Sequence, residues 1–193
     1  KEWVFSPRTQ FAYNPKTKKD IILTAAAGLY MQPPFYREMR NLEGVLNLDL
    51  KAQKSAHFVL GLDYAFKAWD RPFKFVTEAY YKYMWDGVPY EFDNVLIRYF
   101  GKNNSKGYVA GLDLRLNGEL AKGAESWVSI SIMSGQEDVR DDFYTDYDVR
   151  KEKVEANGQV ISETLDTLSS SNVFPGYIPR PTDQRLSFAV FFQ

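Results

Sequence analysis

The chain has 193 residues, enough for one ordinary domain, with a net charge of −1 and a sequence pI of about 6.0. This near-neutral balance gives no electrostatic case for binding nucleic acid. Cysteine is absent, which excludes disulfides, thiolate metal sites and cysteine nucleophiles within these residues. Aromatic residues make up 16% of the chain. Such rings suit the interface between membrane and water, although a tyrosine-rich soluble β-protein has the same composition.

Alternating apolar and polar residues predict that the chain forms strands. A strand places successive side chains on opposite faces, and no stretch here approaches the roughly 18 apolar residues of a membrane-spanning helix. The segment 35–54 mixes short alternation with helix-like polar spacing, so its structure stays open. In chain order, the eight predicted strands are residues 3–13, 21–30, 56–66, 73–83, 95–101, 108–116, 127–133 and 186–192.

The predicted strand 73–83 shows the alternation most clearly. Phe73, Phe75 and Tyr81 share one face, whereas Lys74 and Glu78 share the other. Segments of about ten residues that alternate throughout, carry aromatic ends and are joined by unequal loops are typical of a barrel with lipid outside and water inside. We therefore expect an all-β fold, an antiparallel transmembrane β-barrel.

The predicted connections differ strongly in length. The turns at 14–20, 69–72 and 122–124 are short, whereas most connections between them are long. The segment 136–185 has no sustained period, is acidic and serine-rich, and ends among prolines. We expect short periplasmic turns, long outer loops, and a long outer-surface loop at 136–185 that contacts a ligand or partner.

Six charged residues have the parity of the water-filled interior. They either form a polar wall that guides a solute or contacts a plug, or they are polar because any wet interior must be polar and internally paired. A charge on the lipid face costs about 2–4 kcal/mol at mid-bilayer, which by itself directs charges inward. The predicted lumen-facing residues are Asp63, Lys74, Glu78, Lys82, Asp113 and Arg115.

No motif predicts catalysis, a metal site or a cofactor. His57 is the only histidine and has no Cys or His partner, so we expect a structural role for it. Phosphate-loop, dinucleotide and nucleophile-elbow motifs are absent from the sequence, and we expect no enzyme activity. An acidic run suggests a calcium site, but it lacks the glycine and terminal glutamate of an EF-hand and is expected to be a solvated loop. That run comprises Asp138, Asp141, Asp142, Asp146 and Asp148.

Four stretches of the sequence resemble a known family. These are residues 6–8 (Ser-Pro-Arg), 32–40 (Gln-Pro-Pro-Phe-Tyr-Arg-Glu-Met-Arg), 50–55 (Leu-Lys-Ala-Gln-Lys-Ser) and 179–185 (Pro-Arg-Pro-Thr-Asp-Gln-Arg). In this order they resemble the C-terminal part of the barrel of a TonB-dependent outer-membrane receptor. The stretch 50–55 is similar to that family's Leu-Lys-Pro-Glu pattern and departs from it at Ala52 and Gln53.

The resemblance implies a partial barrel in the outer membrane of a Gram-negative cell. The family's barrel has 22 strands around a plugged lumen, so about eight strands would be roughly a third of a larger barrel. Residues 1–193 would then be a single β-barrel segment. Its partners would be outer-membrane lipid, the rest of its own barrel and plug, the TonB system through an N-terminal part, and a surface lipoprotein. The intact protein would take up a scarce solute that the sequence does not name.

Two other functions stay open at the level of sequence. One is a complete eight-stranded outer-membrane barrel with an adhesin or structural role, which size and even strand number permit. Against it, both ends look cut and the inward Lys82 and Arg115 are large for such a lumen. The other is a soluble β-sandwich that acts as a binding module.

Overall fold

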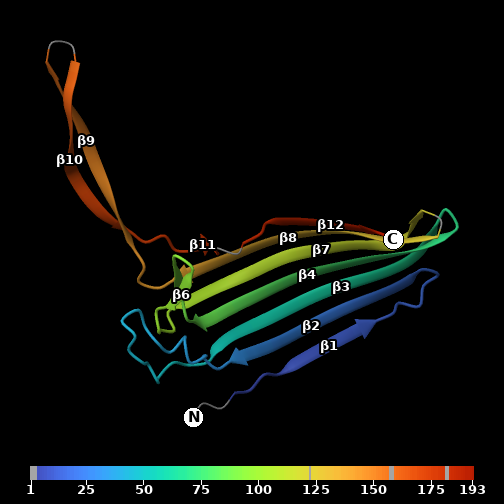
Figure 1. Cartoon of the computed structure of the whole chain (residues 1–193). Coiled ribbons are helices and arrows are strands. Elements are labelled where there is room, and N and C mark those ends of the chain that lie inside the picture. Colours follow the sequence, from blue (N-terminus) through green and yellow to red (C-terminus); the bar gives the residue numbers. More distant parts are fainter. Residues whose placement is uncertain (1–3, 122, 157–158, 181–182) are drawn as a thin grey trace.

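The chain folds into one large antiparallel sheet with smaller hairpins at one end (Figure 1). The computed structural model describes residues 4–121, 123–156, 159–180 and 183–193; Trp3, Lys122, Pro181 and Thr182, which the sequence interpretation used, lie outside these ranges. Strand makes up 69% of the chain, and the described residues contain no helix. The main sheet contains β1 (Arg8–Tyr13), β2 (Asp20–Gln32), β3 (Gln53–Ala68), β4 (Arg71–Gly87), β7 (Ser105–Ala121), β8 (Ala124–Val139), β11 (Ile178–Pro179) and β12 (Leu186–Phe192).

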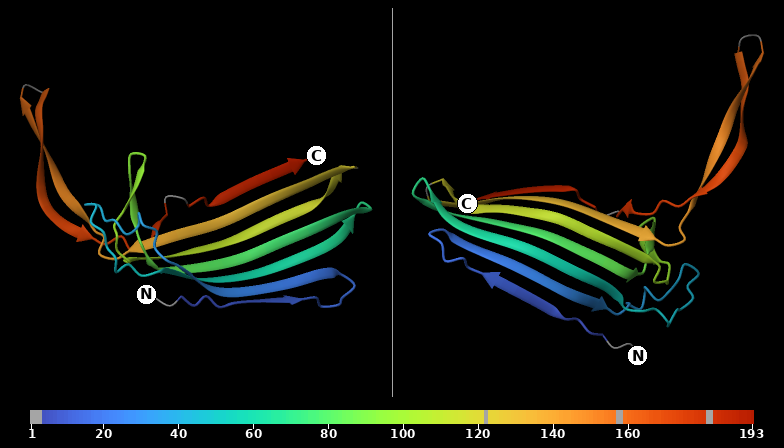
Figure 2. Two further views of the ribbon diagram at one scale, coloured as in Figure 1. Left: turned by 60° about the horizontal axis from the view of Figure 1, so that its bottom comes forward. Right: turned by 180° about the vertical axis from the view of Figure 1, so that it is seen from behind.

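All the short turns lie at one end of this sheet, as predicted. They join β1 to β2, β3 to β4 and β7 to β8, while every long connection lies at the other end (Figures 1 and 2). The β3–β4 turn is the two-residue pair Trp69–Asp70, and both residues have positive φ, 51° and 57°. Two consecutive positive φ values give the primed turn whose twist matches that of the flanking strands. We call the two ends of the sheet the turn end and the loop end.

Two of the long connections pack against each other at the loop end. The Glu38 carboxylate accepts the Phe35 amide at 2.7 Å and the Gln53 side chain at 3.2 Å, and this residue is buried. Asn103 exchanges two hydrogen bonds with the backbone of Lys51, at 2.8 and 3.0 Å. Within the segment 35–54, whose structure the sequence left open, residues 35–52 form a set of turns with one isolated bridge between Arg40 and Leu46, and β3 begins at Gln53.

The predicted strand at 95–101 is not part of the main sheet. Its central residues form β6 (Leu96–Tyr99), which pairs only with β5 (Tyr90–Asp93) as a separate hairpin. Asn94 in the turn has φ 55°, and Arg98 pairs with Asp93 at 3.2 Å. These local contacts stabilise the pairing of β6 with β5. In the main sheet, β4 therefore pairs with β7 and not with β6.

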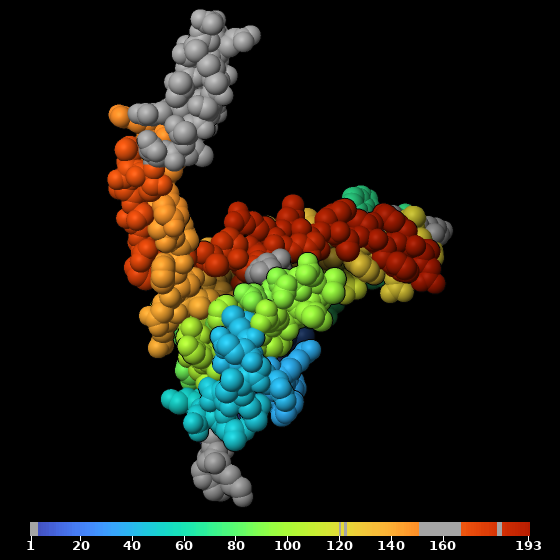
Figure 3. Space-filling view, turned by 60° about the vertical axis from the view of Figure 1, so that its left-hand side comes forward, coloured from blue at the N-terminus to red at the C-terminus, as the bar shows by residue number. Residues whose placement is uncertain are grey.

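The segment 136–185, expected to be a long loop without a sustained period, contains regular strands. Within it, β9 (Tyr144–Ala156) and β10 (Gln159–Val173) form a long hairpin that projects away from the sheet at the loop end (Figures 1 and 3). The pairing shifts register between Val160 and Ser162 and between Thr167 and Ser169. Each register shift reverses which side chains lie on which face of the strand. An isolated hairpin also has no single buried face. Alternating hydrophobicity in the sequence therefore does not reveal these two strands.

The register gives the main sheet one apolar and one polar face. Directly opposite residues of an antiparallel pair lie on the same face, so a row can be followed from strand to strand. Neither face is covered, and the described apolar residues that are buried are only Ala52, Phe73 and Val88. Two adjacent rows of the apolar face are Leu23, Leu62, Thr77, Leu114, Ile130 and Phe188, and Ala25, Leu60, Ala79, Leu112, Ile132 and Leu186.

The sheet is open among the described residues. On one side β1 pairs only with β2, and on the other β12 pairs only with β8, so β1 and β12 do not meet. No second sheet packs against either face in the part of the chain that the structure describes. The structure therefore provides neither a closed eight-stranded barrel nor a sandwich.

We predict that residues 1–193, refolded alone in plain buffer, self-associate. Two unpaired edges and an uncovered apolar face both promote association between copies. Size-exclusion chromatography with light scattering should detect large species without detergent and smaller ones in micelles. A monodisperse folded monomer in plain buffer would contradict the prediction.

Candidate functional site

The six residues predicted to face the lumen share the polar face of the sheet. Asp63, Val76 and Arg115 stand opposite one another in one row of β3, β4 and β7, while Glu78 and Asp113 stand opposite in another. Lys74 and Lys82 follow the same parity along β4, at the turn end and the loop end respectively. Sequence parity thus correctly grouped these side chains on one face.

At the turn end, the charged side chains of this face either form an ion pair or lie against an aromatic ring. Lys74 Nζ lies 2.6 Å from Asp63 Oδ2 in an ion pair between neighbouring strands. Arg115 donates to Asn117 at 2.8 Å and lies over the ring of Trp127, with 4.8 Å between the guanidinium carbon and the ring centroid. Both arrangements are what a self-paired polar interior requires.

The middle of the polar face carries two acidic groups in direct opposition. Glu78 and Asp113 are cross-strand partners, and neither makes an ion pair within the described residues. Tyr80 lies over Gly111, whose missing side chain leaves room for the ring, and Asp113 acts electrostatically on that Tyr80 hydroxyl. Like charges directly opposite on a sheet destabilise it, so this pair is not explained by internal pairing.

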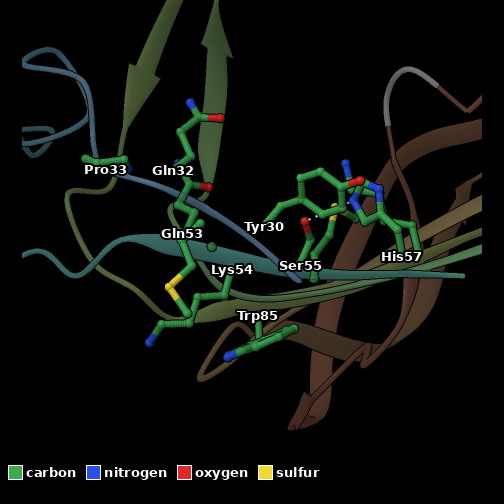
Figure 4. A pocket seen from close by; sticks show the side chains of 12 residues that line it. Tyr30, Gln32, Pro33, Gln53, Lys54, Ser55, His57 and Trp85 are labelled. Atoms are coloured by element: carbon green, nitrogen blue, oxygen red, sulfur yellow. Dashed lines mark hydrogen bonds between the residues drawn. The ribbon is translucent and has the colours of Figure 1, made fainter. Parts of the chain in front are cut away.

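The loop end of the polar face contains a hollow of about 500 Å³ (Figure 4). Figure 4 shows Tyr30, Ser55 and His57 gathered on one side of the strands, with Trp85 on the other. A second hollow of about 290 Å³ adjoins it and shares Tyr30 and His57 as walls. A third hollow, of about 360 Å³, is lined by His57, Tyr80 and Lys82, so His57 borders all three.

A stack of three side chains separates the first two hollows. The guanidinium carbon of Arg8 lies 4.3 Å from the centroid of the Tyr30 ring, and that centroid lies 4.2 Å from the centroid of the His57 ring. Ser55 Oγ and His57 Nε2 are hydrogen-bonded at 3.0 Å. A side chain at Gly28 would meet Tyr30 Cε2 at 3.0 Å and Arg8 Cγ at 3.2 Å, so glycine makes room for the stack. His57 thus lines a recess as well as packing within the sheet.

Lys82 completes this region on the β4 side. It is the cross-strand partner of His57 and interacts electrostatically with His57 and with Arg180, which follows β11. Sequence reasoning had selected Lys82 but not Arg8, Tyr30, Ser55 or Arg180. Arg8, Ser55 and Arg180 belong to three of the motifs quoted for the family resemblance, and no other pattern in the sequence singles them out.

The residues of the acidic run have separate surroundings in the described structure. Asp138 pairs with Lys106 at 3.1 Å, and no group of three metal-ligating side chains is found among the described residues. Asp141 and Asp146 are exposed. Desolvation, followed by the nearby Asp138 carboxylate, raises the pKa of Asp142.

Comparisons with known proteins identify no relative. No family model matches the chain, no curated protein matches it, and no solved structure matches its fold. In the described part of the chain there is also no helix that is long and apolar enough to cross a membrane.

We predict that two charge-removing substitutions on the polar face change the free energy of unfolding in opposite directions. Glu78→Gln should raise the free energy of unfolding by up to about 1 kcal/mol because it relieves the repulsion with Asp113. Asp63→Asn should lower it by up to about 1 kcal/mol because Lys74 loses its partly exposed partner. Urea unfolding of both variants, followed by tryptophan fluorescence, measures the two changes. If Glu78→Gln also lowered the free energy of unfolding, Glu78 and Asp113 would not be in net repulsion.

Proposed function

We propose that this chain is part of the β-barrel of a TonB-dependent receptor that takes up a scarce solute across the outer membrane. The observation that carries the proposal is a single-layer sheet with one apolar and one polar face, neither of which is covered by other described residues. A soluble protein has little reason to leave contiguous apolar rows in water, whereas lipid outside and water inside solvate both faces of a barrel wall.

The distribution of apolar residues fits the thickness of a membrane. Aliphatic rows occupy the middle of the apolar face, Phe66 and Phe73 pair near the turn end, and Tyr83 and Tyr108 pair near the loop end. Ten residues separate Phe73 from Tyr83; at about 3.4 Å per residue and a tilt of about 40°, that span is about 26 Å high. Barrels of this class have an apolar band of about 25 Å between two aromatic girdles.

The asymmetry of the connections supports an orientation. Bacterial outer-membrane barrels have short periplasmic turns and long extracellular loops. The turn end would then face the periplasm, and the loop end, with β5–β6 and the β9–β10 hairpin, would face outward. In this orientation the β9–β10 hairpin is the element that extends farthest for contact with a ligand or a surface lipoprotein.

The open edges support a segment of a larger barrel. Unpaired edge groups are not tolerated in hydrocarbon, so β1 and β12 require neighbouring strands there. The rest of the same barrel would supply them, and a plug would lie against the polar face. The assignment to TonB-dependent receptors, and hence the TonB partner, depends on the motif resemblance alone.

The other functions are less well supported. A complete eight-stranded adhesin or structural barrel requires β12 to pair with β1, and a sandwich module requires a second sheet on the apolar face. Neither contact occurs among the described residues.

We predict that an arginine is tolerated on one face of β8 and not on the other. Ile132 is 51% exposed on the apolar face, so Ile132→Arg should cost little in water but about 2–4 kcal/mol if that face meets lipid. Ser131→Arg is the matched control, since Ser131 lies beside Asp113 on the polar face. Urea titration of the protein folded in lipid vesicles measures both costs. Equal costs would contradict a lipid-facing apolar side.

We also predict the size and location of the natural protein. Peptides from residues 32–40 should be recovered by mass spectrometry from outer-membrane extract, in a species several times heavier than 22.3 kDa. A mature species near 22.3 kDa would exclude the receptor proposal and return the small closed barrel as the hypothesis to test.

A further inference from the structure

The loop end of the polar face holds cations that have no acidic partner. Arg8, Gly28, His57 and Lys82 form one continuous row across β1, β2, β3 and β4. Among the described residues, neither Arg8 nor Lys82 makes an ion pair; Arg8 contacts the ring of Tyr30, and Lys82 has the imidazole and another cation as electrostatic neighbours. Lys82 and Arg180 repel each other electrostatically, and an anion beside them would reduce that repulsion.

The nearby carboxylates are already engaged elsewhere. Asp86 pairs with Lys54 at 2.8 Å, and Asp138 pairs with Lys106. Asp183, almost buried, accepts the Gly135 amide at 2.9 Å through one oxygen and lies 3.6 Å from Arg185 through the other. The local acids therefore do not neutralise Arg8 or Lys82.

Arg180 lies next to this region, in a smaller recess of about 60 Å³ that shares Gln53, Met84 and Gly87 with the larger hollow. Its Nε is buried and makes no hydrogen bond, although it lies 3.4 Å from a Glu137 carboxylate oxygen. Its Nη1 reaches only the sulfur of Met84, at 3.8 Å, and Met84 lines the larger hollow. A buried donor without a hydrogen bond costs stability unless something accepts from it.

We propose that the hollow beside His57 and Lys82 binds an anionic group, a carboxylate or a phosphate. Lys82 lines the hollow and supplies the charge, and Ser55 and the imidazole supply further hydrogen-bonding groups. Arg8 lines the adjoining hollow, and Arg180 lines a smaller recess that shares Met84 with the larger one. The volume of about 500 Å³ suits a small organic anion, in the range usual for ligand sites. This inference deepens the proposed function, since it gives the chemistry of one site on the wall that a solute would pass.

The anion has two sources that share this chemistry. It is either a free solute that enters from the loop end or an acidic side chain from another segment of the same protein. In both cases Lys82 forms a charge-assisted contact, which is among the strongest polar interactions in proteins. The two sources differ in whether Lys82 already contacts a carboxylate of the protein before any ligand is added.

The first experiment is a calorimetric titration of the intact natural protein in detergent, with citrate and with inorganic phosphate as probes. If the anion is a solute, we expect binding that weakens roughly tenfold or more in Lys82→Gln and is retained in Lys82→Arg. Lys74→Gln is the matched control, because Lys74 lies on the same strand and face but is paired with Asp63. Binding that Lys82→Gln leaves unchanged would overturn the proposal.

If neither probe binds, carbodiimide coupling of the same preparation decides between the remaining outcomes. An internal carboxylate would form an amide with Lys82, seen by mass spectrometry as a cross-linked peptide that disappears in Lys82→Gln. No cross-link and no binding would overturn the proposal. Both measurements are made on the protein in micelles, so they are independent of the vesicle comparison of Ile132→Arg with Ser131→Arg, and the two proposals can fail separately.

Discussion

The register of the antiparallel backbone ladder is the constraint on which the rest of this structure depends. With only Ala52, Phe73 and Val88 buried among the described apolar residues, there is no interior core to position the strands. Hydrogen bonds between the strands therefore hold the sheet together. If one strand slipped by one residue relative to its neighbours, all its apolar side chains would move to the polar face. The two-residue turn at Trp69–Asp70 fixes that register between β3 and β4.

Because the register is fixed, the polar face has three regions of different charge along its strands. The turn end is neutralised by the Asp63–Lys74 pair, the middle opposes Glu78 to Asp113, and the loop end leaves Lys82 without an acid. Internal pairing explains the first region only. In the other two regions the described residues supply no opposite charge to Glu78, Asp113 or Lys82.

The alternation in the sequence was sufficient to locate seven of the eight predicted strands in the main sheet and to group the six charged residues on one face. It predicted a strand at 95–101 but not that this strand stands outside the main sheet, and it did not predict β9 and β10 within 136–185. A local hairpin is stabilised by its own turn and pairing, as in the Arg98–Asp93 contact, and needs no long apolar face. Hydrophobic periodicity reports which side chains share a face, so it does not show whether a strand joins the main sheet or a separate hairpin.

The sequence by itself determined the strand class, the two-faced pattern, and the placement of short turns at one end, because side-chain alternation and turn chemistry are local properties. Only the tertiary structure decided which strands are neighbours and which side chains meet across them. Arg8, His57 and Lys82 come from distant parts of the chain and form one row only because β1, β2, β3 and β4 pair in this register. Arg180 joins them only because β11 returns to β8, a long-range pairing that no local pattern specifies.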